Sequence, residues 1–509
     1  ATDIPPKVRR RIVEAGLPLV PTDAEKAMLL YWVAEREAVA SGDRTPQTVK
    51  ATLAAAERIY EHYPDTKFAA QARWLAASTL VAAGSAEEAL ALVRSLQKPE
   101  APAPAGLDRA LFAASQAYFR EKDYDKSEAL LREILRDFPS GATASRAMLG
   151  LSQVAVARHD AKGQREWLLK CAEFPNTDPT RRGIMDTDNT RSVAIQRLAA
   201  LAEGRRRWDE ALRWWQAWQP RSWCGTCQMH MQTRKRYHET VCRLHLGRPR
   251  EAARTCLDAV LGDEGHCDAP LAVLLYELYR EAGQVQDLLA MVDSYERGKL
   301  ADYHKRGLDK NVKPEVLRRM LPTRPIRQAM EIDALADSGQ TGPLVEIARR
   351  SSFGNTDTFE EGGSRRDWKC RLAAEGLARC GGREVVAIRG ALAERKGNIS
   401  WLIYTLGKSR SPEAVKLLEE LAAQEKAWQC GNVAYALSLH GDRGREILKR
   451  LAADGENTDM QTAAQKRVEE IAAGGGSPGP AARPRPKPGS LPRSQSETRA
   501  KAPPYSHPA

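Results

Sequence analysis

An acidic residue followed by small or apolar residues recurs about every forty positions through the first three hundred residues of the chain. The recurring stretches are SAEEALALV (85–93), YDKSEALLREI (124–134), GQREWLLKC (163–171), RWDEALRWW (207–215), RPREAARTC (248–256) and QVQDLLAMV (284–292). Their acidic residues are Glu88, Glu128, Glu166, Glu210, Glu251 and Asp287, separated by 40, 38, 44, 41 and 36 positions. Such a period is typical of stacked repeats, in which each unit buries its apolar face against its neighbours.

The stretches between these acidic residues are typical of two amphipathic helices per unit, with apolar residues at helical spacing. Thr22 with Glu25, and Ser85 with Glu88, have the spacing of a capping box, which satisfies free amides at a helix start. Glycines at 84, 204, 247 and 283 stand where a left-handed residue can end a helix. Because proline cannot continue a helix, we also expect helices to end at three aromatic-proline pairs. These pairs are Tyr63–Pro64, Phe138–Pro139 and Phe174–Pro175.

The stretch YEHYPDTKFAAQARWLAAS (60–78) places a Tyr-Pro helix end before a helix of small residues. This portion of the chain resembles tetratricopeptide-like repeat proteins, in particular bacterial outer-membrane assembly lipoproteins and periplasmic Tol-system coordinators. The resemblance covers roughly Asp23 to Gly298. It implies helical hairpins that bind proteins, and it favours a bacterial cell envelope or periplasm over the alternative of a cytoplasmic location. The unit here is longer than the usual repeat of about 34 residues, so we expect extended turns.

A second, shorter repeat follows. LARCGGREVVAI (377–388), LGKSRSPEAVKLL (406–418) and LSLHGDRGREILKRL (437–451) align at Leu377, Leu406 and Leu437, with steps of 29 and 31. Each copy reads as a helix end, a turn with Gly or Pro, and a second helix. These units resemble short HEAT-like repeats, which imply protein binding, and LADSGQTGPLVEI (335–347) is a candidate earlier copy.

These patterns predict an all-α protein, an α-solenoid of helical hairpins that are tetratricopeptide-like and then HEAT-like. The predicted organisation is an N-terminal extension (1–22), a tetratricopeptide-like solenoid (23–298), a connecting segment (299–326), HEAT-like repeats (327–472) and a tail (473–509). The tail holds nine prolines and almost no aliphatic residues, which predicts a disordered basic Pro/Gly/Ser-rich segment.

The formal net charge of the chain is +12, and the tail supplies +5 of it, from six basic residues less Glu497. The body is therefore only mildly basic, and its arginine clusters are short and scattered. This distribution argues against nucleic acid as the main partner. Binding of nucleic acid or an anionic membrane surface by the tail remains an alternative. No apolar run approaches the roughly 18 residues that a transmembrane helix needs.

Residues 222–230 read SWCGTCQMH, which begins like a thioredoxin-type redox motif. That reading requires a strand before Cys224, and the preceding stretch is an amphipathic helix closed by proline. A contiguous zinc set of Cys224, Cys227, His238 and Cys242 requires a broken helix, because His238 lies about 16 Å along a helix from Cys227.

Stacked hairpins instead bring the loops at 219–227 and 262–270 side by side. Cys224 and Cys227 are then expected to face Cys267, with His230 or His266 in reach, as a structural zinc site or a cross-repeat disulfide. The alternative is unlinked thiols. The other cysteines lie in apolar helical patterns and are expected in the core; they are Cys171, Cys242, Cys256, Cys370, Cys380 and Cys430.

Trp208 and Trp215 lie seven residues apart on one predicted helix face and are expected to fill an interface between repeats. The alternative is an aromatic ledge for a partner, to which Trp214 and Trp218 would contribute. No phosphate-binding, zinc-protease or nucleophile-elbow motif is present. The sequence therefore favours a non-enzymatic scaffold that binds a protein or peptide and needs no cofactor. The alternative is a zinc- or disulfide-linked thiol module at Cys224 and Cys227.

Overall fold

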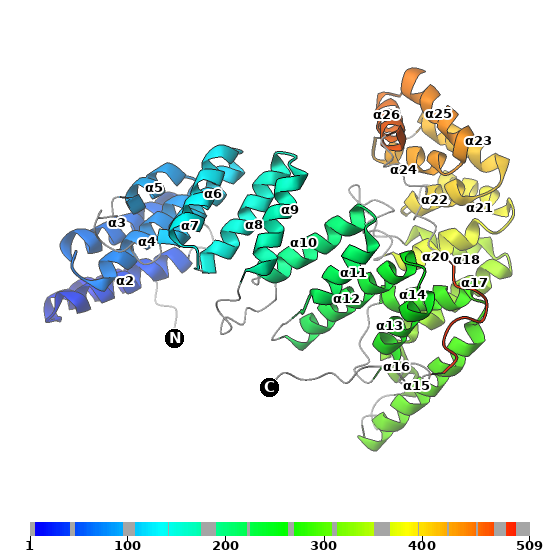
Figure 1. Cartoon of the computed structure of the whole chain (residues 1–509), viewed down its shortest axis with the longest axis horizontal. Coiled ribbons are helices and arrows are strands. Elements are labelled where there is room, and N and C mark those ends of the chain that lie inside the picture. The colour runs from blue at the N-terminus through cyan, green and yellow to red at the C-terminus, as the bar shows by residue number, and fades with distance from the viewer. Residues whose placement is uncertain are drawn as a thin grey trace. The chain divides into compact units, whose positions relative to one another are not determined.

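The computed structural model describes residues 6–40, 46–94, 107–140, 142–174, 190–220, 224–262, 269–307, 313–350, 367–394, 397–424, 427–454, 457–472 and 485–494. Within these ranges every regular element is a helix and there is no strand (Figure 1). None of these helices is long and apolar enough to cross a membrane. The chain divides into two compact units, Ala1–Ala202 with Ala217–Trp223, and Glu203–Gln216 with Cys224–Ala509.

The first unit is built from helices in pairs. In chain order it contains α1 (Pro6–Gly16), the 3₁₀ turn η1 (Leu17–Leu19), α2 (Asp23–Ala40), α3 (Pro46–His62), α4 (Lys67–Ala82), α5 (Ala86–Arg94), α6 (Leu107–Arg120), α7 (Tyr124–Asp137), α8 (Ala142–Ala157), α9 (Ala161–Glu173) and most of α10 (Thr190–Gly204). The helices α2, α4, α6 and α8 pack on one another in sequence, and each packs against the helix that follows it. Leu131 and Ile134 of α7 are fully buried in the core that α6, α7 and α8 share.

The ends of these helices follow the predicted signals. Thr22 and Glu25 form the reciprocal capping box, with each backbone amide 3.3 Å from the other side chain. Helices α3, α7 and α9 stop one residue before their aromatic-proline pairs. Glycines 84, 247 and 283 have positive φ, as expected at a helix end, but Gly204 does not, and Arg206 takes the left-handed position at φ 56° instead.

The acidic residues that mark the repeat all lie in the first two turns of the second helix of a pair, in α5, α7, α9, α11, α13 and α15. In α5, α11, α13 and α15 the acidic residue lies in the first turn, where the helix dipole favours a negative charge.

The second unit continues the pairs and adds the shorter repeats. It contains α11 (Trp208–Ala217), α12 (Gly225–His245), α13 (Pro249–Leu261), α14 (Ala269–Glu281), α15 (Val285–Lys305), α16 (Pro314–Met320), α17 (Arg324–Asp337), α18 (Thr341–Arg349), α20 (Trp368–Leu377), α21 (Arg383–Ala393), α22 (Ser400–Lys408), α23 (Pro412–Gln424), α24 (Ala427–Ser438), α25 (Gly441–Asp454) and α26 (Thr458–Ala472). One apolar core runs from Leu244 to Leu491, through both kinds of pair.

The shorter repeats stack in two layers. Helices α17, α20, α22, α24 and α26 pack on one another in one layer, and α18, α21 and α23 pack in a second. At the start of α23, Ser411 accepts the Glu413 amide at 3.3 Å, and Pro412 takes the first helical position, as predicted. The successive pairs of both units confirm the all-α class and the α-solenoid of helical hairpins. The domain boundaries drawn from the sequence stay predictions.

Residues 485–494 differ from the expectation for the tail. These ten residues are described and are packed on the second unit, where Leu491 is only 2% exposed. The prediction of disorder does not hold for these ten residues, because a buried leucine and specific backbone hydrogen bonds hold them in place. The other residues of the predicted tail, 473–484 and 495–509, lie outside the described residues.

Candidate functional site

The Cys-x-x-Cys motif lies at the start of α12. Cys224 is the N-cap residue, and Cys227 falls in the first helical turn. Both thiols are half-buried, and neither is in a disulfide with a described cysteine. The backbone amide of Cys227, followed by its thiol, lowers the pKa of Cys224, whereas the hydrogen bond to Cys224 raises the pKa of Cys227. A partly exposed thiol with a lowered pKa at a helix start is in the environment typical of reactive cysteines, whereas structural cysteines are buried and inert.

The contiguous zinc set does not converge, because α12 is one unbroken helix from Gly225 to His245. His238 lies instead against the carboxylate of Glu203, with Nδ1 to Oε1 at 3.0 Å. Cys242 is fully buried, and this burial is the main reason that its pKa is raised. This outcome confirms the reasoning from helix length.

The second predicted zinc or disulfide set includes Cys267 and His266, which lie outside the described residues. Across the part of the chain that is described, no three His, Cys, Asp or Glu side chains are grouped as a metal site requires. The cross-repeat link therefore stays a prediction. The six cysteines expected in the core are all buried there.

The tryptophans near α11 do not form the aromatic ledge that was the alternative prediction. Trp215 stacks on His238 at 4.1 Å and Trp208 on His245 at 3.8 Å, so both fill the contact of α11 with α12 as expected. Trp218 is only 1% exposed, and its Nε1 donates to Ser192 Oγ at 2.6 Å. The assignment of Trp218 to a partner surface is therefore wrong, because its ring and its polar atom are both used inside the first unit. Trp214 is half-buried, and its role stays a prediction.

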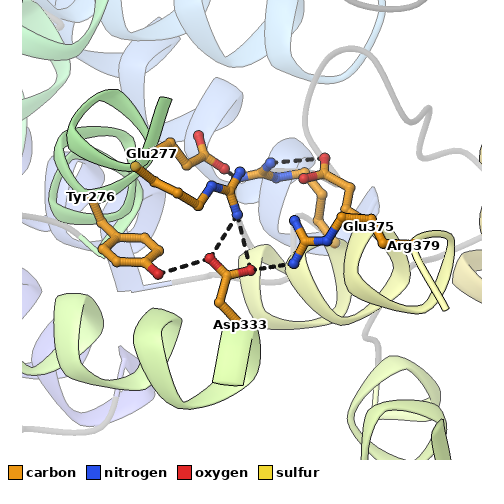
Figure 2. Close-up of polar contacts among 7 residues, drawn as sticks. Tyr276, Glu277, Asp333, Glu375 and Arg379 are labelled. Atoms are coloured by element: carbon orange, nitrogen blue, oxygen red, sulfur yellow. Dashed lines mark hydrogen bonds and ion pairs between the residues drawn. The ribbon is translucent and has the colours of Figure 1, made fainter. Parts of the chain in front are cut away.

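A buried carboxylate joins α14, α17 and the turn that follows α20 (Figure 2). Asp333 of α17 accepts hydrogen bonds from Tyr276 Oη at 2.8 Å, Arg280 Nη1 at 2.8 Å and Arg379 Nη2 at 2.7 Å. Burial by itself raises the pKa of Asp333, but the charge of Arg280 and these hydrogen bonds outweigh it and hold the pKa below its ordinary value.

A second ion pair lies beside this carboxylate. Arg371 of α20 donates to Glu277 of α14 at 2.6 Å and to Glu375 at 3.0 Å. The contacts of Tyr276 and Arg280 with Asp333, and of Glu277 with Arg371, hold α14 against α17 and α20. The next turn of α14 and the start of α15 form the surface on which the tail segment lies.

The tail segment 485–494, drawn in red in Figure 1, binds where α14 ends and α15 begins. Gln284, the N-cap residue of α15, accepts the Leu491 amide at 2.8 Å and donates to the Leu491 carbonyl at 3.2 Å. Tyr279 Oη donates to the Pro492 carbonyl at 2.7 Å. The Gly489 amide donates to the Ala282 carbonyl at 3.3 Å. These contacts bind the backbone of a segment made of a turn and bends, and the side chain of Leu491 is inserted into the core.

The side chain of Gln284 is held in one orientation. Its Nε2 also donates to Asp287 Oδ2 at 2.9 Å, which directs the amide oxygen to the Leu491 N–H. Arg493 lies 3.8 Å from the same Asp287 oxygen. The one local signal that could have indicated this site is the Leu491–Pro492 pair, in a tail that is otherwise poor in aliphatic residues.

A recess of about 700 Å³ opens beside α15, α16 and α17. Its lining includes five arginines, and Arg327 among them binds Asp293 and Glu296. The recess is strongly charged, in contrast to the mostly apolar lining of typical small-molecule sites.

No family model matches the sequence, and no curated protein matches it. Among solved structures, the chain is similar to the TPR domain of P58(IPK), with 13% identity, coverage of 89% of this chain and 99% of that chain, and a TM-score of 0.19. A likeness at that TM-score supports no conclusion about this chain.

Proposed function

We propose that the chain is a non-enzymatic α-solenoid scaffold that binds a protein partner by holding a non-helical segment of it on a helical surface. The observation that carries this proposal is the segment 485–494, which lies on α14 and α15 through hydrogen bonds to its own backbone. Stacked helical pairs bury their apolar faces against one another, and their remaining surfaces can hold peptide segments in this way.

We also propose that the first solenoid is tetratricopeptide-like and that the second contains HEAT-like repeats. The helical pairs with an acidic residue early in the second helix support a tetratricopeptide-like first solenoid. The two-layer stacking of α17–α26 supports HEAT-like repeats in the second. A bacterial cell-envelope location rests on the sequence resemblance alone.

Affinity capture tests the proposed function. The full-length chain would be immobilised as wild type and as Leu491→Asp, in which a charge at a buried position releases the tail segment. We expect a protein that is retained specifically and that forms a defined complex with the chain when both are purified. Failure of every retained protein to form a complex from purified components would contradict the scaffold function.

A reactive thiol pair at Cys224 and Cys227 is the second candidate function, and the lowered pKa of Cys224 favours it. A lowered pKa gives more thiolate at neutral pH, so limiting iodoacetamide should label Cys224 first. Cys171, whose pKa burial raises to about 11, is the internal control and should stay unlabelled. Labelling of Cys224 no faster than Cys171 would remove this candidate.

Zinc content separates the metal form of this candidate from the thiol form. One zinc per chain, lost in Cys224→Ser, would support the predicted link to Cys267. Nine free thiols without zinc would leave the thiol pair alone. Tail binding to nucleic acid or an anionic surface stays a prediction from composition.

A further inference from the structure

The segment 485–494 is bound as a peptide rather than as a repeat element. Pro486, Leu491 and Pro492 are buried, whereas Arg485 and Lys487 face outward. It contains no helix, and it contacts residues about two hundred positions earlier in the chain. Its three apolar residues and its backbone groups, together with Arg493 near Asp287, therefore supply the contacts with the second unit.

Local contacts help to set the shape of the bound segment. Lys487 to Ser490 form a turn in which the Ser490 amide donates to the Lys487 carbonyl at 3.0 Å. Gly489 has φ 71°, and Pro488 precedes it, which are the features of a type II turn. The backbone φ angles of the free segment are restricted further at Pro486, Pro488 and Pro492. A restricted ligand loses less conformational entropy when it binds.

The surface beneath it is selective. The amide of Gln284, itself only 5% exposed, accepts and donates at one residue, so it requires a backbone whose N–H and carbonyl are both free of other partners at the Leu491 position. Leu491 enters the apolar core of the second unit. Pro492 follows without an N–H that would need a partner. Asp287 then faces the positive charge of Arg493.

We propose that the surface formed by Tyr279, Gln284 and Asp287 recognises a non-helical Leu-Pro-Arg segment of a partner protein, and that residues 485–494 occupy it in cis as a competitor. This inference rests on the proposed scaffold function and names the partner's chemistry. Only the 12 residues 473–484 separate α26 from the bound segment. A ligand on so short a tether has an effective concentration on the order of millimolar, so a partner must outcompete it.

A labelled peptide, RPKPGSLPRS, added in trans to the full-length chain tests the proposal by fluorescence anisotropy. We expect it to bind the Leu491→Asp chain at least about tenfold more tightly than the wild type, because the tail then no longer fills the site. A peptide with aspartate in place of its leucine should not bind. Equal affinity for the two chains, or no binding to Leu491→Asp, would overturn the proposal.

Two further variants in the Leu491→Asp chain locate the site. Gln284→Ala should weaken peptide binding at least about tenfold, because a buried backbone donor and acceptor both lose their partner. Gln286→Ala, at an exposed position two residues away, is the matched control and should leave the affinity unchanged. Equal binding by both variants would overturn the proposal.

Folding of the variants is followed independently. If Gln284→Ala disturbs the fold, Tyr279→Phe removes only the hydroxyl that binds the Pro492 carbonyl, and it should weaken the peptide roughly three- to tenfold. Unchanged affinity in Tyr279→Phe would count against the site. A wild-type dimer that the peptide dissociates, seen by light scattering, would assign the surface to a second copy and overturn the partner assignment.

The two proposals fail in different ways. A partner that stays bound to the Leu491→Asp/Gln284→Ala chain would keep the scaffold function and remove this site. A peptide that binds as expected, while no protein forms a complex, would keep the site and remove the scaffold function.

Discussion

Gln284 contacts both backbone polar groups of Leu491, with the Leu491 N–H to Gln284 Oε1 distance at 2.8 Å and the Gln284 Nε2 to Leu491 carbonyl distance at 3.2 Å. The two residues lie 207 positions apart, and the contact holds the tail segment on the second unit. It therefore couples the state of the tail to the availability of the surface on α14 and α15.

Trypsin should report this coupling. Within the segment, Arg485 and Lys487 are each followed by proline, which blocks cleavage, so Arg493–Ser494 is the bond to follow. We expect Leu491→Asp to speed cleavage at Arg493 by at least about tenfold, because proteolysis follows the population of the released segment. Ser490→Ala, which removes a buried hydroxyl with no partner among the described residues, is the control and should match the wild type. Equal rates in Leu491→Asp and the wild type would mean that the segment is not held.

The Asp333 network should be important for the stability of the second unit. Asp333→Asn leaves Arg280 and Arg379 without their carboxylate, and we expect the free energy of unfolding to fall by about 3 kcal/mol at pH 7. The measurement is urea unfolding, monitored by hydrogen exchange of the backbone amides in α14 and α17. Asp337→Asn changes an exposed residue of the same helix and should cost less than about 0.5 kcal/mol. A comparable loss in both variants would show that burial of the pair has no special effect.

The same carboxylate predicts a dependence on acid. The pKa of Asp333 is lower in the folded chain than its ordinary value of 3.8, so the unfolded chain takes up the proton first as pH falls. Its contribution is complete above that ordinary value and is lost below it. The difference in unfolding free energy between wild type and Asp333→Asn should therefore be constant near neutral pH and should shrink below pH 3.8. A difference that stays constant to the lowest measurable pH would contradict this assignment.

Alanine substitutions at Trp218 and Trp214 should differ in their effect on stability, because Trp218 lies in the core and Trp214 is half-buried. Trp218→Ala removes a fully buried ring and its hydrogen bond to Ser192, and we expect a loss of about 3 kcal/mol in the first unit. Hydrogen exchange in α10, which carries Ser192, measures it. Trp214→Ala, at a half-buried position, should cost much less. The reverse order would return Trp218 to the partner surface.

The helical pairs could be predicted because their signals are local. The acidic residues, capping boxes and aromatic-proline ends lie within a few positions of the helix ends they mark, so the period fixes the pairs. The stacking of Trp215 between α11 and α12 also follows from one amphipathic face.

The remaining features depend on distant partners. Trp218 follows the end of α11, and its ring nitrogen donates to Ser192, 26 positions earlier. Arg371 and Glu277 lie 94 positions apart. The tail composition predicts disorder, and only the fit of Leu491 beside Gln284 changes that outcome for ten residues. Sequence patterns without a common period do not report such contacts.

Hydrogen exchange at the Leu491 amide tests the central claim most directly, because that proton is bound only if Gln284 holds the segment. We predict that it is protected in the wild type and in Gln286→Ala, and that it exchanges near the rate of the free peptide in Gln284→Ala. Exchange at the free-peptide rate in the wild type would contradict the account, because the tail would then be unbound and the peptide site would lose its observed ligand.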